Sequence, residues 1–145
     1  MAQVDFYQLS RDPIERVVPL LATKAIEGGA RLLVVHGDTA QRAALAEALW
    51  AREGAFLANG DMGEPHAARQ PILLSADCTA SNGARMAILA DGEWREAAAA
   101  FERAILLFGP DQTEAARRLW STLAEGGHAL RIFKQGEQGG WREGR

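Results

Sequence analysis

Cysteine is nearly absent from this chain of 145 residues, in which Cys78 is the single example. One thiol cannot form an internal disulfide, and it cannot supply a zinc site built from several thiolates. His36, His66 and His128 are far apart in the sequence and do not form the i, i+4 pair with which a helix binds a metal. We therefore expect no metal site and no cofactor.

Long apolar runs are missing as well. No run reaches the length of about 18 residues that a membrane span needs, and residues 1–5 lack the basic start and apolar stretch of a signal peptide. Hydrophobic residues make up 48% and charged residues 24%, which is typical of a globular protein rather than a disordered one. We expect one cytoplasmic domain over residues 1–134, followed by a flexible tail over residues 135–145 that is rich in glycine and charge.

Apolar runs alternate with segments of helical periodicity. Strands are predicted at residues 4–9, 31–36, 72–75, 85–90, 103–108 and 128–133. Helices are predicted at residues 14–27, 39–52, 96–101 and 111–125, and residues 55–71 are predicted to form a long loop. Residues 103–108 could also continue the preceding helix, although Gly109 and Pro110 directly after them favour a strand. This order predicts a three-layer α/β fold, with a mostly parallel sheet flanked by helices.

The glycine-rich loops of nucleotide-binding proteins are also lacking. Residues 10–13 and 37–40 follow the first two predicted strands, and neither segment matches the dinucleotide fingerprint or the phosphate loop. Without those glycines the backbone cannot approach a pyrophosphate closely. The sequence therefore predicts a Rossmann-like sheet without a nucleotide site.

One predicted helix carries a basic residue beside an aromatic one. Arg117 and Trp120 are three residues apart on the helix over residues 111–125, so they share a face, and the next predicted strand carries Arg131 and Lys134. A guanidinium group beside an indole ring suits an acidic peptide with an apolar anchor. The alternative is that Trp120 lies at the edge of the core and that the arginines are only solvated.

A second aromatic pair follows the helix over residues 39–52. Trp50 lies about 100° around that helix from Leu49, which belongs to its apolar face, and Phe56 follows in the predicted loop. An exposed Trp–Phe pair would form a protein-binding patch. The alternative is that both rings are covered by the loop.

Polar residues at the ends of predicted strands leave a different class of function open. His36, Asp38 and Ser75 each lie at or just after a predicted strand end. A small α/β hydrolase or transferase would place its catalytic groups there, in a compact polar pocket. No pair of carboxylates and no nucleophile motif supports this alternative in the sequence itself.

Several short motifs, taken together in their order and spacing, resemble the chi subunit of bacterial DNA polymerase III over about residues 4–134. The motifs are Phe6-Tyr7-Gln8-Leu9, Leu49-Trp50-Ala51 with Phe56, Pro71-Ile72-Leu73-Leu74, Leu107-Phe108-Gly109-Pro110, Arg117 with Leu119 and Trp120, and Gly127. The resemblance implies a non-catalytic accessory subunit of the holoenzyme. Such a subunit links the clamp loader to single-stranded DNA-binding protein by holding its acidic C-terminal tail, which ends in aspartates followed by Ile-Pro-Phe.

The resemblance also implies roles for particular residues. Arg117 corresponds to the basic residue that holds the tail and Trp120 to the aromatic residue one turn on, with Arg118 as a further candidate. Trp50 and Phe56 correspond to the patch that binds the psi subunit, and a helicase is a second possible partner there. The resemblance implies contact with DNA only through these partners, and no contact with a membrane. The segment between Pro110 and Arg117 is shorter than in some members of the family, with Thr113 and Glu114 in place of further basic contacts.

Overall fold

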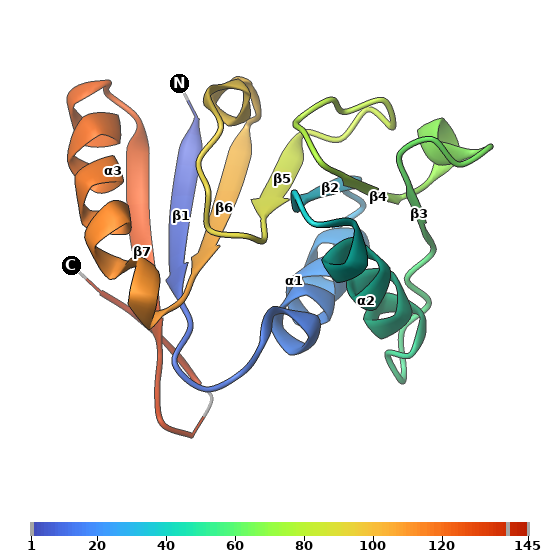
Figure 1. The fold of residues 1–145 in the computed structure, drawn as a ribbon, viewed down its shortest axis with the longest axis horizontal. Coiled ribbons are helices and arrows are strands. Elements are labelled where there is room, and N and C mark those ends of the chain that lie inside the picture. Colours follow the sequence, from blue (N-terminus) through green and yellow to red (C-terminus); the bar gives the residue numbers. More distant parts are fainter. Residues whose placement is uncertain (1, 139, 145) are drawn as a thin grey trace.

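The structure is a computed structural model that describes residues 2–138 and 140–144. It contains one eight-stranded sheet in the order β3-β4-β2-β5-β6-β1-β7-β8, in which β8 alone is antiparallel to its neighbour. Figure 1 shows the sheet with its helices. The strands are β1 (Gln3–Gln8), β2 (Leu32–Val35), β3 (Asn59–Asp61), β4 (Ile72–Ser75), β5 (Met86–Leu89), β6 (Arg103–Phe108), β7 (Ala129–Gln135) and β8 (Trp141–Glu143). The helices are α1 (Ile14–Glu27), α2 (Thr39–Trp50) and α3 (Thr113–Glu125), with short 3-10 helices η1 (Ala67–Arg69), η2 (Glu96–Ala100) and η3 (Pro110–Gln112).

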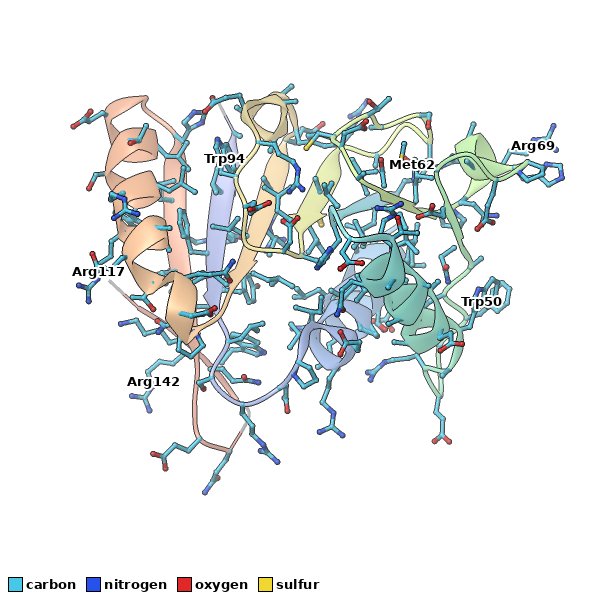
Figure 2. All side chains as sticks on the ribbon, viewed as in Figure 1. Trp50, Met62, Arg69, Trp94, Arg117 and Arg142 are labelled. Atoms are coloured by element: carbon cyan, nitrogen blue, oxygen red, sulfur yellow. The ribbon has the colours of Figure 1, made fainter. Side chains whose placement is uncertain are left out.

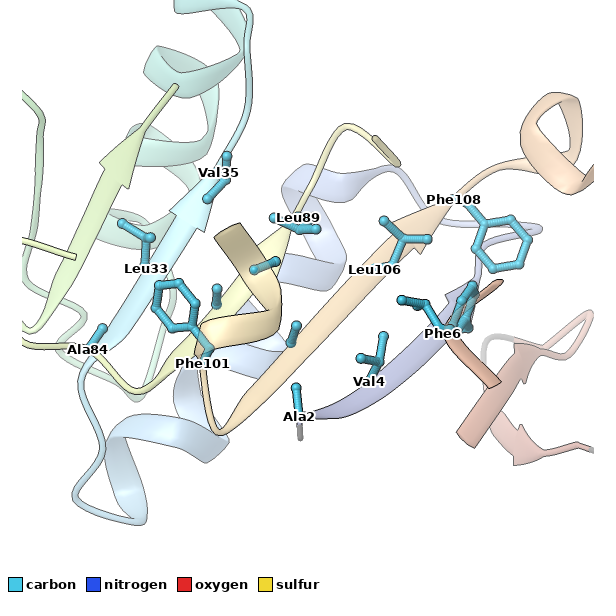
Figure 3. Close-up of a cluster of buried hydrophobic side chains, with 14 of the residues drawn as sticks. Ala2, Val4, Phe6, Leu33, Val35, Ala84, Leu89, Phe101, Leu106 and Phe108 are labelled. Atoms are coloured by element: carbon cyan, nitrogen blue, oxygen red, sulfur yellow. The ribbon is translucent and has the colours of Figure 1, made fainter. Parts of the chain in front are cut away.

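Helices cover both faces of the sheet, which confirms the predicted three-layer α/β fold. On one face, apolar side chains of α1 and α2 such as Val18 and Leu49 pack in a cluster with alternate residues of β2, β4, β5 and β6. On the other face, Ala116 and Leu123 of α3 pack in a second cluster. Figure 3 shows Phe6 and Phe108 of this cluster. The central strands are buried on both faces, which is why their sequences read as continuous apolar runs.

The edge strand β3 and the start of α3 differ from the sequence prediction. Residues 55–71 are not all loop, because β3 pairs in parallel with β4 at the edge of the sheet. Its polar sequence gives no strand signal, and Asp61 at its end accepts a 2.8 Å hydrogen bond from Nε of Arg42 on α2. The helix α3 begins at Thr113 and not at Asp111, since residues 110–112 form the 3-10 turn η3.

No described helix has both the length and the apolar character needed to cross a membrane.

The C-terminal segment also differs from its prediction. We expected a flexible tail over residues 135–145, whereas residues 141–143 form β8 and pair with the end of β7. The ring of Trp141 packs edge-on against Tyr7 with 5.0 Å between centroids, and Tyr7 stacks on Phe133 at 4.8 Å. This contact supplies the apolar burial that the composition of the segment did not suggest. Gly139 and Arg145 of the predicted tail lie outside the described residues.

Gln135 joins this C-terminal hairpin to the loop after β1. Its side-chain carbonyl oxygen accepts hydrogen bonds from the backbone N–H groups of Ser10, Arg11 and Asp12, at 3.2, 2.9 and 3.1 Å. Its amide nitrogen donates to the carboxylate of Asp12 at 2.9 Å. The three donors of this loop are therefore already satisfied within the chain, at the place where a nucleotide-binding sheet would present them to a phosphate.

The carboxylate of Asp5 on β1 is fully buried and lies between arginines from both neighbouring strands. Arg103 on β6 donates to it from Nε at 2.7 Å, and Arg131 on β7 donates from Nε and Nη2 at 3.0 Å each. Burial alone raises the pKa of the Asp5 carboxyl, but hydrogen bonds from Arg131, Gln3 and Arg103 outweigh it, and the pKa is lowered. These contacts tie three strands together through one charged group.

Replacing Asp5 tests this cluster. The pKa of Asp5 is lower in the folded state than in the unfolded state. The stabilisation by the charged carboxylate is therefore complete above the unfolded pKa, and it is lost as the pH falls through the folded pKa. We expect Asp5→Asn to lower the free energy of unfolding by about 2 kcal/mol at pH 7, with a smaller deficit below about pH 4. Urea denaturation between pH 3 and 7 measures this, with exposed Glu137→Gln as the control. A deficit that does not change with pH would contradict the assignment.

Replacing Gln135 tests the contact between hairpin and loop. We expect Gln135→Ala to lower the free energy of unfolding by about 2 kcal/mol, because three backbone donors lose their acceptor. Thermal or urea denaturation measures the effect. Gln138→Ala is the matched control, since Gln138 is exposed in the turn of the same hairpin. Equal stability of the two variants would show that the loop does not depend on Gln135.

Candidate functional site

A groove of about 460 Å³ runs between α3 and the strands β1 and β7. Residues of the helix and alternate residues of the strands line the groove together. Its described lining residues are Phe6, Gln8, Phe108, Thr113, Ala116, Arg117, Trp120, Ser121, Ile132 and Lys134. None of these residues is acidic, so the groove is apolar at its floor and cationic at its edges.

Trp120 forms part of the floor of this groove. Its ring meets Phe6 in an edge-to-face contact with 5.1 Å between centroids, and Phe6 in turn meets Phe108 at 6.3 Å. Trp120 is half-buried, so it is at once an edge residue of the core and an accessible wall of the groove. The alternative that Trp120 lies at the edge of the core is thus confirmed, and its part in binding a peptide stays a prediction. An aromatic floor of this kind provides a place for an apolar side chain of a ligand.

Arg117 and Lys134 supply the positive charge. Nη1 of Arg117 lies 3.8 Å from Oε1 of Glu114, and both side chains are more than three-quarters exposed. A surface pair at that distance contributes little, so the guanidinium group remains available to an incoming carboxylate. Lys134 lies on β7 at the other side of the groove and is exposed.

The structure corrects the role expected for Arg131. Arg131 pairs in register with Asp5, and Ile132 pairs with Phe6, so alternate residues of β7 point to opposite faces of the sheet. Arg131 binds the buried carboxylate of Asp5 on the face away from α3, whereas Ile132 and Lys134 line the groove. The sequence itself indicates this difference, because residues an odd number of positions apart on a strand point to opposite faces of the sheet. Arg131 and Lys134 are three positions apart.

Residues of α3 also differ in whether they line the groove. Arg118 is exposed and does not contribute to the groove lining, although it follows Arg117 directly. Ala115 is exposed as well. Thr113 lines the groove, and the sequence gave no reason to select it.

Trp50 and Phe56 form an exposed aromatic pair far from the groove. Their rings meet edge to face with 5.7 Å between centroids, and the two residues are 53% and 79% exposed. The following loop leaves both rings uncovered, so the alternative in which the loop covers them is wrong. A protein-binding patch at this pair stays a prediction. In Figure 2 Trp50 lies at one end of the molecule and Arg117 at the other.

The strand ends do not assemble catalytic groups from His36, Asp38 and Ser75. The carboxylate of Asp38 caps α2 by accepting from Ala40 and Gln41, and Nδ1 of His36 accepts from the backbone of Asp38 at 3.0 Å. Ser75 pairs in register with Val35, the residue before His36, so the side chains of His36 and Ser75 leave opposite faces of the sheet. No nucleophile–base hydrogen bond links them among the described contacts.

A wider cavity of about 710 Å³ does lie at this edge of the sheet, and Asp12 and His36 are among its lining residues. The backbone donors of residues 10–12 beside it are occupied by Gln135. Burial raises the pKa of the Cys78 thiol, whereas a lowered pKa is typical of a nucleophilic cysteine. The three residues that the enzyme alternative selected thus make backbone and turn contacts in the described part of the chain.

Comparison with known proteins supplies the family. A search of curated proteins gives no match. The model of the DNA polymerase III chi subunit family (HolC) matches residues 1–131, which is most of the chain and includes β1–β6 and all three helices. Subunits of this family are accessory components of polymerase III. The chain belongs to the DNA polymerase III chi subunit family.

Proposed function

We propose that this chain is a cytoplasmic, non-catalytic subunit that links the clamp loader to single-stranded DNA-binding protein. In this proposal the groove at Arg117 and Trp120 binds the acidic C-terminal tail of that protein. The observation that carries the proposal is the composition of the groove, which joins an aromatic floor to two cationic side chains with no acidic residue among its described lining.

The chemistry of the groove fits a peptide that combines carboxylates with an aromatic end. Carboxylates bind guanidinium groups through charge-assisted hydrogen bonds, so Arg117 is the first contact for the peptide's negative charge. The terminal phenylalanine packs against Trp120 and Ile132, where it displaces water from apolar surface. Lys134 contributes a second, longer-range attraction from the opposite side.

The Trp50–Phe56 pair supports a second contact, with the psi subunit or a helicase. Two large exposed aromatic rings in contact are a typical centre of a protein interface. Because this pair and the groove lie at opposite ends of the molecule, both partners can bind at once (Figure 2). The chain would then act as a tether, which raises the local concentration of the clamp loader at coated DNA without any reaction of its own.

Removing the Arg117 guanidinium tests the groove. We expect Arg117→Ala to weaken binding of a short acidic peptide ending in Ile-Pro-Phe by roughly 1–3 kcal/mol, because a charge-assisted contact is lost. Calorimetric titration measures this. Arg118→Ala is the matched control, since it removes the same charge from the next residue, which lies outside the groove lining. Unchanged affinity of Arg117→Ala, or an equal loss in both variants, would remove the site assignment.

Truncating Trp50 tests the separation of the two surfaces. We expect Trp50→Ala to leave the affinity for the peptide unchanged. It should weaken binding of the second partner by about 2 kcal/mol, the scale of an interface hot spot. Titration with the peptide and, separately, with the psi subunit or the helicase measures both effects. Glu53→Ala is the control, because Glu53 is an exposed neighbour without an aromatic ring. Loss of peptide binding in Trp50→Ala would contradict two independent surfaces.

A further inference from the structure

The groove continues onto the C-terminal hairpin, beyond the range that the family model matches. Residues 132–145 follow that range, and they include the groove-lining Ile132 and Lys134 as well as the whole of β8. The chemistry of this part of the groove therefore has to be argued from the hairpin itself.

We propose that Arg142 on β8 acts with Lys134 as a second cationic contact that binds the acidic stretch preceding the apolar end of the peptide. This inference rests on the proposed function of the groove and adds a binding residue to it. Arg142 is directly opposite Lys134 in the β7–β8 register. Directly opposed residues of antiparallel strands have their side chains on the same face. Arg142 therefore lies on the face of Lys134, which is the face of the groove.

The charges of the hairpin are sorted between its two faces. Arg142 and Lys134 share the groove face, whereas Glu143 is opposite Phe133 on the other face. On that face the hydrogen bond to Asp5 raises the pKa of Arg131, and the charge of Glu143 adds to this effect. Directly opposed like charges destabilise a pair of strands. Neither Lys134 nor Arg142 forms an ion pair with a described residue. A bound carboxylate would relieve this repulsion, so the hairpin favours an anionic ligand at that point.

The hairpin is held close to the groove. The backbone N–H of Gly144 donates to the carbonyl oxygen of Ile132 at 2.7 Å. A Cβ atom on Gly144 would lie 3.2 Å from Cγ2 of Ile132 and 3.6 Å from Cε of Lys134. The end of β8 thus runs directly against two groove-lining side chains. Gln135 and Trp141 anchor the other side of the hairpin on the loop after β1 and on Tyr7.

Arg117 lines the groove together with Lys134, and Arg142 is the cross-strand neighbour of Lys134. Figure 2 shows both arginines projecting from the same end of the molecule, well away from Arg69 at the opposite end. An extended peptide with its aromatic end at Trp120 can then place its preceding carboxylates along the line from Arg117 to Arg142. The proposed ligand is one acidic peptide and not a nucleic acid, because a single apolar floor around Trp120 and Ile132 lies beside these cations and fits one apolar peptide end.

Two peptides separate this contact from the groove itself. The first is an acidic peptide ending in Ile-Pro-Phe, and the second has the same end but asparagine in place of each aspartate. We expect Arg142→Ala to lower the affinity for the acidic peptide about threefold at low salt. Arg142→Glu should lower that affinity further. Neither variant should change affinity for the neutral peptide. Arg69→Ala, which removes the same charge at the far end of the chain, should leave both affinities unchanged.

The outcomes distinguish the two proposals. If Arg142→Ala and Arg142→Glu bind the acidic peptide as tightly as Arg69→Ala does, while Arg117→Ala weakens it, the role of the hairpin is wrong and the groove stands. If the unaltered chain does not bind the acidic peptide, both proposals fail. Because Arg142 is exposed, circular dichroism should show an unchanged fold in its variants.

Discussion

The buried carboxylate of Asp5 is the contact on which the arrangement of the C-terminal half of the sheet depends. It binds arginines from β6 and β7 at the same time, and the three neighbouring strands are paired in register at this point. That register directs Arg131 to one face of the sheet and sends Ile132 and Lys134 to the other, where α3 packs. The groove is therefore cationic through Arg117 and Lys134, while Arg131 serves stability.

The contact of Gln135 with the loop after β1 explains how this Rossmann-like sheet can lack a nucleotide-binding site. In nucleotide-binding relatives of this architecture, the loop after the first strand offers its backbone N–H groups to a phosphate. Here the side chain of Gln135 takes three of those donors, and its own amide is satisfied by Asp12. The loop is thus closed by the same hairpin that we propose extends the groove on the opposite face.

The accessible chemistry of the molecule consequently lies at its two ends. One end carries the groove with its aromatic floor and cations, and the other carries the exposed Trp50–Phe56 pair (Figure 2). Neither surface has a converging nucleophile and base, and the polar residues at the strand ends serve as caps and turn contacts. The chain belongs to a family of accessory subunits, and in the proposed function these two surfaces bind different partners.

The sequence by itself determined the fold class and most element positions, since buried parallel strands and amphipathic helices carry strong local periodicity. It also placed Arg117 beside Trp120, because helical spacing makes them neighbours. Tertiary structure alone decided the edge strands β3 and β8, whose pairing compensates for weak local signals. It decided too that Trp50 and Phe56 are uncovered and that Arg131 turns away from the groove, because exposure and facing depend on which distant segments pack against a residue.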